Sequence, residues 1–199
     1  MEKLKEMIQS LIDINDEEWE VAKSIFQFKN FKKGELIIYP NEICKNNYYV
    51  LNGIVRSYVY SEEGKESTLA LHVNNEKDYL DPFFGDFVSY TTQSIGEVTS
   101  EAISDCRVAF ASFKDIEALY ETNIKWMKFG KIMAENHIVK LVESKRWSML
   151  NATERFSHIE KYKSIYLDIL PDYQLASLIG ITPQSLSRIK KELNCKKST

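Results

Sequence analysis

The amino-acid sequence predicts an α+β protein with an N-terminal β unit, a long central helix and a C-terminal helix-turn-helix. Three observations lead to this prediction. Short runs rich in Val, Ile, Tyr and Phe, separated by turn residues, fill residues 31–112. From about residue 115 to 148 the apolar residues recur at helical spacing instead. Residues 171–193 then contain two short amphipathic stretches on either side of a glycine.

The composition is that of a chain with one or two packed domains. Of its 199 residues, 44% are hydrophobic, which is enough to bury a sizeable core. No run approaches the ~20 consecutive apolar residues of a membrane span. Residues 1–20 are amphipathic and acidic, unlike a signal peptide. We therefore expect a cytoplasmic protein without a membrane partner.

No residue spacing in the sequence is typical of a metal site or of a catalytic set. The cysteines form no Cys-x-x-Cys pair and are odd in number, which predicts free thiols. The histidines are scattered, and two nearby aspartates lack a partner base or nucleophile. We therefore expect neither an enzyme nor a bound cofactor. The residues considered are Cys44, Cys106, Cys195, His72, His137, His158, Asp81 and Asp86.

The charge of the chain is unevenly distributed. The net charge is −3, but residues 145–199 carry ten Lys and Arg against five Asp and Glu. This segment is therefore +5, which leaves −8 for residues 1–144. A basic C-terminal quarter on an acidic body is typical of a nucleic-acid-binding end, although a solvated lysine-rich tail has the same charge.

The first two elements are a helix and a β unit. Residues 1–25 are expected to be helical, because Leu4, Ile8, Leu11 and Ile12 lie at helical spacing. The short strands that follow are separated by turn residues, which predicts a sandwich or barrel. These turn residues are Gly34, Asn41, Asn52, Gly53 and Gly64.

The predicted central helix carries two apolar stripes and therefore needs two packing partners. One partner would be the β unit. The other would be the same helix in a second subunit, which predicts a homodimer; the alternative is burial within one monomer. The first stripe contains Tyr120, Ile124, Met127, Ala134, Ile138 and Leu141, and the second contains Leu119, Trp126, Phe129 and Met133. A further helix is expected to start at the N-cap Thr153, with Phe156, Ile159 and Tyr162 on one face.

Residues 171–193 are the most specific segment of the sequence. Asp172 can cap a first helix, and Gly180 suits the left-handed residue that ends it. Thr182 followed by Pro183 is a favoured start for a second helix. The expected buried positions are Leu175, Ala176, Leu178, Ile179, Leu186, Ile189 and Leu193.

The opposite face of the second helix predicts contact with duplex DNA. At 100° per residue, Gln184, Ser185 and Arg188 share one polar face near the helix start, where helix-turn-helix proteins meet base edges. Phosphate contacts are expected from the surrounding lysines. The predicted DNA-binding residues are Thr182, Gln184, Ser185, Arg188, Lys190 and Lys191, with Lys196 and Lys197 as further phosphate contacts.

Nearly the whole chain resembles the Crp/Fnr family of bacterial transcription regulators. Residues 46–71 resemble the early strands of that family's β-roll, and FFGD at residues 83–86 resembles the start of its phosphate-binding cassette, usually F-G-E. TPQSLSR at residues 182–188 matches the start of its recognition helix, with Arg188 on the characteristic arginine. The resemblance implies a cyclic-nucleotide-binding-like β-roll or jelly roll over residues 1–114, a dimerisation helix over 115–149 and a (winged) helix-turn-helix over 150–199.

Several departures from the family pattern affect the predicted function. An Arg-Ser/Thr pair would hold the cyclic phosphate, but Gly96 and Glu97 occupy those positions, and a glutamate facing the phosphate would repel it. No Lys or Arg lies between residues 78 and 105, and Asp86 replaces the cassette glutamate. The oxygen-sensing cysteine cluster is absent, and residues 165–172 leave little room for a full wing. The degenerate effector pocket is expected to comprise Phe84, Gly85, Asp86, Gly96 and Glu97.

The sequence therefore favours a dimeric DNA-binding regulator that does not use cyclic AMP, and its effector stays unknown. The resemblance also implies an inverted-repeat DNA site and RNA polymerase as a further partner. Two alternatives stay open. The protein could bind a cyclic nucleotide by a non-standard route, or it could be an interaction module that has lost DNA binding.

Overall fold

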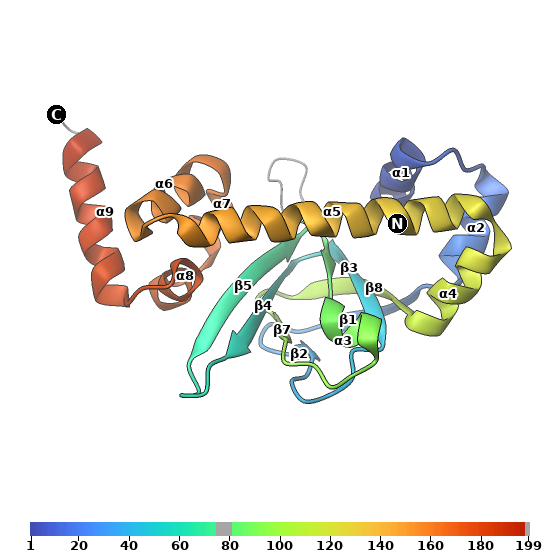
Figure 1. The fold of residues 1–199 in the computed structure, drawn as a ribbon, viewed down its shortest axis with the longest axis horizontal. Coiled ribbons are helices and arrows are strands. Elements are labelled where there is room, and N and C mark those ends of the chain that lie inside the picture. Colours follow the sequence, from blue (N-terminus) through green and yellow to red (C-terminus); the bar gives the residue numbers. More distant parts are fainter. Residues whose placement is uncertain (75–80, 198–199) are drawn as a thin grey trace.

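A computed structural model of the chain describes residues 1–74 and 81–197, with side chains described up to residue 193. Figure 1 shows a β-roll beneath one long helix, α5 (Ile124–Met149). Three helices, α1 (Glu2–Leu11), α2 (Asp16–Ser24) and α4 (Phe113–Thr122), gather at one end of α5, and the C-terminal helices gather at the other. No helix in the described residues is long and apolar enough to cross a membrane.

The N-terminal region forms two helices, α1 (Glu2–Leu11) and α2 (Asp16–Ser24), rather than the single predicted helix. The break occurs because Asn15 accepts a hydrogen bond from the Glu18 backbone N–H, and the Glu18 carboxylate accepts one from the Asn15 backbone N–H. This capping box starts a new helix without a glycine or proline. Glu18 also accepts hydrogen bonds from Asn123 and Lys125, which fixes α2 to the start of α5.

The predicted β unit is confirmed as two four-stranded antiparallel sheets that face each other. One sheet has the order β1-β8-β3-β6 and the other has the order β2-β7-β4-β5. Their inner faces enclose a core that includes Val50, Val55 and Val108, all fully buried. The strands are β1 (Gln27–Phe31), β2 (Leu36–Ile38), β3 (Asn46–Asn52), β4 (Ile54–Tyr60), β5 (Glu66–Val73), β6 (Phe83–Phe84), β7 (Thr99–Ala102) and β8 (Cys106–Ser112), with helix α3 (Phe87–Thr92) between β6 and β7.

The central helix is divided at Asn123 into α4 (Phe113–Thr122) and α5, so the prediction of one continuous helix is wrong. Asn123 adopts an extended conformation, and its side chain caps α5 by accepting a hydrogen bond from the Lys125 backbone N–H. Asparagine is a favoured N-cap, and a helix can therefore end and restart at this residue without a glycine or proline.

The two apolar stripes have different environments. Leu119 and Trp126 of the second stripe are buried against the N-terminal helices. By contrast, Met127, Ile138 and Leu141 of the first stripe are 53%, 59% and 57% exposed. The described part of the chain leaves these three side chains uncovered, so the alternative of burial within one monomer is wrong for them.

Four helices follow α5 in the described residues. They are α6 (Ala152–Tyr162), α7 (Ile165–Ile169), α8 (Asp172–Ile179) and α9 (Pro183–Lys197). Asn151 is the N-cap of α6 through a capping box with Glu154, so the prediction of Thr153 as the cap is wrong. Residues 113–197 contain no strand and therefore no wing. The core of these helices continues into the roll through Leu71 and Val73 of β5.

Candidate functional site

The turn between α8 and α9 has the predicted conformation. Gly180 has a φ of 73°, the left-handed region that favours glycine, and the Ile181 N–H donates to the Ala176 carbonyl at 2.9 Å. Thr182 caps α9, because its Oγ1 accepts a hydrogen bond from the Ser185 backbone N–H at 3.2 Å. Asp172 does not cap α8, contrary to the prediction; it forms an ion pair with Lys190 of α9 at 2.5 Å.

One face of α9 packs on α8 while the other remains accessible. Leu186 and Ile189 are buried against a surface that includes Ala176, whose small side chain allows close approach of the two helices. Thr182, Gln184, Arg188 and Lys191 are exposed, and Ser185 is half-buried. The predicted division of α9 into a buried and an exposed face is thus confirmed.

The exposed face is organised by hydrogen bonds. Arg188 donates to Ser185 Oγ at 3.3 Å, and the Ser185 and Thr182 hydroxyls lie 3.1 Å apart. Lys190 is held in its ion pair with Asp172 and therefore points away from this chain of side chains. The side chains of Lys196 and Lys197 lie outside the described residues. The structure thus brings together Thr182, Ser185 and Arg188 and separates Lys190 from them.

Helix α8 is fixed to the edge strand β5 of the roll. The Ser177 Oγ accepts a hydrogen bond from the Thr68 backbone N–H at 2.8 Å and donates to the Glu66 carbonyl at 3.0 Å. The fully buried Arg56 lies beneath this contact, where it donates to Thr68 Oγ1 and pairs with the Glu66 carboxylate at 2.7 Å. Nothing in the spacing of these residues in the sequence signalled this attachment.

In the cassette, the Asp86 carboxylate accepts three hydrogen bonds from backbone N–H groups of its own chain. Its Oδ1 accepts from the Ser89 N–H at 3.0 Å, and its Oδ2 accepts from the N–H groups of Glu97 and Val98 at 3.0 and 3.1 Å. Asp86 is only 5% exposed and is also the N-cap of α3. These donors are therefore not available to an external anion while Asp86 holds them.

Position 96 has no room for a side chain. A Cβ atom on Gly96 would overlap the Asp86 carboxylate and lie 2.8 Å from the Ser89 Cβ. The Gly96 carbonyl also accepts a hydrogen bond from the Asn41 N–H, and the Gly96 N–H donates to the Glu42 carbonyl, both at 2.9 Å. Glu97 is exposed, so the expectation that its carboxylate faces the pocket is wrong; its backbone N–H faces Asp86 instead.

The interior of the roll next to Phe84 is filled by stacked rings and a buried hydrogen-bond chain. The Phe84 ring stacks on Tyr48 and His72 at centroid distances of 5.1 and 5.3 Å. Ser57 Oγ lies 3.0 Å from His72 Nε2 and 2.9 Å from Ser100 Oγ. Burial lowers the pKa of His72 to about 4, so the ring is neutral near neutral pH.

The structure pairs His72 with the Ser57 hydroxyl, a contact that the scattered histidines of the sequence did not indicate. The His72 Nδ1 lies 3.1 Å from the Asp81 carbonyl, so the imidazole is oriented on both sides. A nucleophile would need access to substrate and a base with a pKa nearer to 7, and this buried pair has neither. In the described residues, no group of three His, Cys, Asp or Glu side chains could hold a metal ion.

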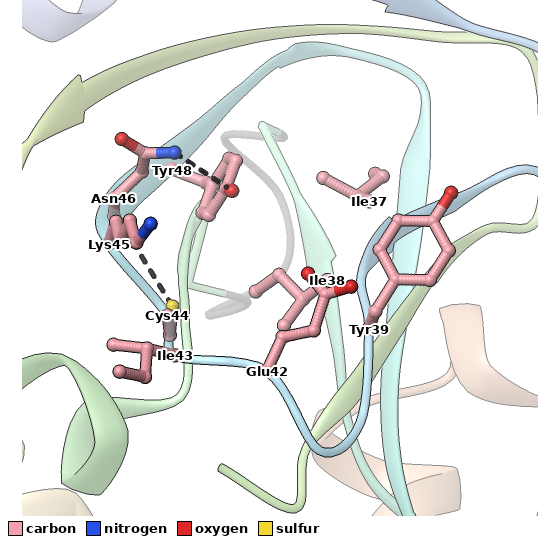
Figure 2. A pocket seen from close by; sticks show the side chains of 9 residues that line it. All are labelled: Ile37, Ile38, Tyr39, Glu42, Ile43, Cys44, Lys45, Asn46 and Tyr48. Atoms are coloured by element: carbon pink, nitrogen blue, oxygen red, sulfur yellow. Dashed lines mark hydrogen bonds between the residues drawn. The ribbon is translucent and has the colours of Figure 1, made fainter. Parts of the chain in front are cut away.

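An open cavity of about 460 Å³ lies beside the cassette rather than in it (Figure 2). Figure 2 shows that its walls come from β2, from the 39–45 loop and from the start of β3. None of the five predicted cassette residues lines it. Its lining residues carry no recognisable motif, and they are Ile37, Ile38, Tyr39, Glu42, Ile43, Cys44, Lys45, Asn46 and Tyr48.

The predicted free thiols are confirmed for the two cysteines whose side chains are described. Cys44 and Cys106 are both buried and unpaired, and burial raises the pKa of the Cys106 thiol to about 11. The Cys195 side chain lies outside the described residues.

The comparisons with known proteins agree with this architecture. Residues 28–123 match the family described as cyclic nucleotide-binding domain. A search of curated proteins gives no match in sequence. Among solved structures, FixK2 from Bradyrhizobium japonicum is 16% identical, with a TM-score of 0.70 over 87% of this chain and 86% of that one.

Two further structures have the same fold. A regulator of the Crp/Fnr family from Eubacterium rectale is 18% identical, with a TM-score of 0.68 over 92% of this chain and 85% of that one. The c-di-GMP responsive global regulator CLP of Xanthomonas campestris is 16% identical, with a TM-score of 0.66 over 92% and 93%. Residues 28–123 therefore form a domain of the cyclic nucleotide-binding family, and the chain as a whole has the fold of the Crp/Fnr family of transcription regulators.

Proposed function

We propose that the protein is a DNA-binding transcription regulator that reads duplex DNA with the N-terminal half of α9. The observation that carries the proposal is the division of α9 into a face buried on α8 and a face that exposes Gln184 and Arg188. Arginine can bond bidentately to guanine, and glutamine to adenine, in the major groove. Lys191 would contact phosphate, and RNA polymerase would be a further partner in the cytoplasm.

Selection from a pool of random duplexes tests DNA binding without assuming an operator sequence. A two-fold dimer places two recognition helices roughly 34 Å apart, so the enriched sequences are expected to be inverted repeats about one helical turn apart. Failure to retain any duplex of the pool at low salt, where phosphate contacts are strongest, would contradict the proposal and favour an interaction module.

The exposed stripe of α5 supports a homodimer. Met127, Ile138 and Leu141 project from one face, and leaving such a stripe in water favours association. Ile138→Asp is expected to shift the protein from dimer to monomer in light scattering, because each dimer would bury two charges in an apolar seam. Val21→Asp is the matched control, since Val21 is a comparably exposed residue on α2. A wild-type monomer near 23.2 kDa at micromolar concentration would refute the dimer.

The cassette supports a regulator that does not respond to cyclic AMP. The phosphate of a cyclic nucleotide would need the donors that Asp86 already occupies, and Gly96 has no space for an arginine side chain. Calorimetry with millimolar cyclic AMP is expected to show no saturable heat. Saturable binding at micromolar concentration would overturn this part of the proposal and favour a non-standard nucleotide site.

A further inference from the structure

One side chain, Arg155 of α6, joins the end of α5 to the turn of the helix-turn-helix. Its Nε–H donates to the Leu150 carbonyl at 2.9 Å. One terminal nitrogen donates to the Ser148 carbonyl at 2.9 Å, and the other donates to the Ile179 carbonyl at 2.8 Å. Three carbonyls from two separate segments therefore converge on one guanidinium.

These carbonyls belong to two helix ends, where backbone acceptors lack partners within the helix. Ser148 lies in the last turn of α5 and Leu150 is its C-cap, while Ile179 is the last residue of α8. Carbonyls in the final turn of a helix lack intrahelical donors and carry the negative end of the helix dipole. A planar guanidinium satisfies several of them at once, whereas the ammonium of lysine is a single point charge.

The Arg155 guanidinium packs closely against the turn between α8 and α9. A Cβ atom on Gly180 would lie 3.1 Å from the Arg155 nitrogen that bonds Ile179. Two residues later Thr182 caps α9, so the guanidinium holds the backbone from which the recognition helix starts. Arg155 itself lies on α6 and is not part of the exposed face of α9.

We propose that Arg155 is a positioning residue that sets the angle between α5 and α9, and thereby the separation of the two recognition helices in a dimer. This inference rests on the proposed function. The attachment of Ser177 to β5 holds α8 on its other side, so loss of the Arg155 contacts would loosen the angle without releasing α8 from the roll.

The first test measures the preference for half-site spacing. Wild-type protein is expected to bind the selected inverted repeat about tenfold more tightly than repeats with one base pair added or removed, since half-site spacing reflects dimer geometry. Arg155→Lys is expected to remove most of this preference. The matched control Arg146→Lys changes an exposed arginine of α5 in the same way and is expected to keep it. A mutation that only destabilised the fold would weaken binding to all spacings alike.

The second test needs no DNA and separates the two proposals. Spin labels at Ser144→Cys on α5 and Ser187→Cys on α9, in a Cys195→Ser background and diluted with unlabelled protein, report the distance within one chain. Wild type is expected to give one narrow distance, and Arg155→Lys a broader distribution. If Arg155→Lys does not fold, Arg155→Gln replaces it. An unchanged distribution would overturn the positioning role, whereas broadening without any DNA binding would overturn the proposed function alone.

Discussion

Helices α3 of the cassette and α9 of the helix-turn-helix begin with the same local device. Asp86 and Thr182 each accept a hydrogen bond from the backbone N–H three residues later. Asp86 lies in the interior and accepts two further hydrogen bonds, from the backbone N–H groups of Glu97 and Val98. These polar groups of the cassette therefore bond to one another. Thr182 lies on the surface, and the side chains beside it remain exposed. The cassette is therefore a closed site, in which the polar groups bond to one another, whereas the start of α9 is an open site with accessible side chains.

The largest expected effect is on the closed site. Asp86→Ala would leave three N–H groups without an acceptor, and it is expected to lower the free energy of unfolding by about 3–5 kcal/mol in urea titrations. Asp86→Asn keeps one acceptor oxygen and is expected to cost less. A variant of unchanged stability would show that the carboxylate does not hold the cassette together.

Gly96 provides the control for that prediction. Gly96→Ala is destabilising because its methyl group would overlap the Asp86 carboxylate. In the double variant with Asp86→Ala the overlap with the carboxylate is gone, so the two costs are expected to be clearly non-additive.

The second effect is a pH dependence of stability from the roll interior. The folded-state pKa of His72 is about 4, below its ordinary value of about 6.5, because burial disfavours the charged ring. The nearby Asp81 opposes this lowering of the pKa and Lys140 adds to it. The contribution of the neutral His72 ring to the free energy of unfolding is therefore complete above about pH 6.5. It falls by up to about 3 kcal/mol as the pH falls toward 4.

His72→Gln removes this titration, and its stability is expected to fall less steeply with acid than that of the wild type. His137 and His158 also have lowered pKa values and remain in both proteins. The difference between the two pH profiles therefore isolates His72. Parallel profiles would show that the His72 ring has the same pKa in the folded and the unfolded protein, which would contradict the prediction.

The smallest effect is expected at the open site. Thr182→Ala removes one cap hydrogen bond at an exposed helix start and is expected to cost about 1 kcal/mol of stability. Thr182→Ser keeps the hydroxyl and is expected to cost little. A loss as large as that of Asp86→Ala would mean that the difference in burial between the two caps does not determine the cost of removing them.

The helix-turn-helix could be predicted from sequence because its signals are local. Gly180, Thr182 and Pro183 each favour one backbone conformation, and the buried faces follow from helical spacing alone. The breaks at Asn15 and Asn123 were missed because an asparagine cap leaves the apolar spacing on either side almost unchanged. Neither break has a glycine or proline beside it that would have indicated the end of a helix.

The remaining features depend on residues distant in sequence. The cassette positions were located from their spacing in the sequence. That spacing did not reveal that Asp86 would accept hydrogen bonds from the backbone N–H groups of the cassette, or that the Glu97 side chain would be exposed. The Ser57–His72 pair and the Arg155 contact with Ile179 join residues 15 and 24 positions apart through tertiary packing. No local pattern in the sequence encodes such contacts.

The most direct test of the DNA-reading surface is a titration of wild-type, Arg188→Ala and Lys191→Ala proteins against the selected operator and a scrambled duplex at two salt concentrations. Arg188→Ala is expected to lose roughly 1–3 kcal/mol on the operator and to relax the preference at one position in each half-site. Lys191→Ala is expected to weaken binding to both duplexes and to lower the salt slope by about one unit. If Arg188→Ala kept the affinity and specificity of the wild type, the exposed face of α9 would not be the surface that reads DNA.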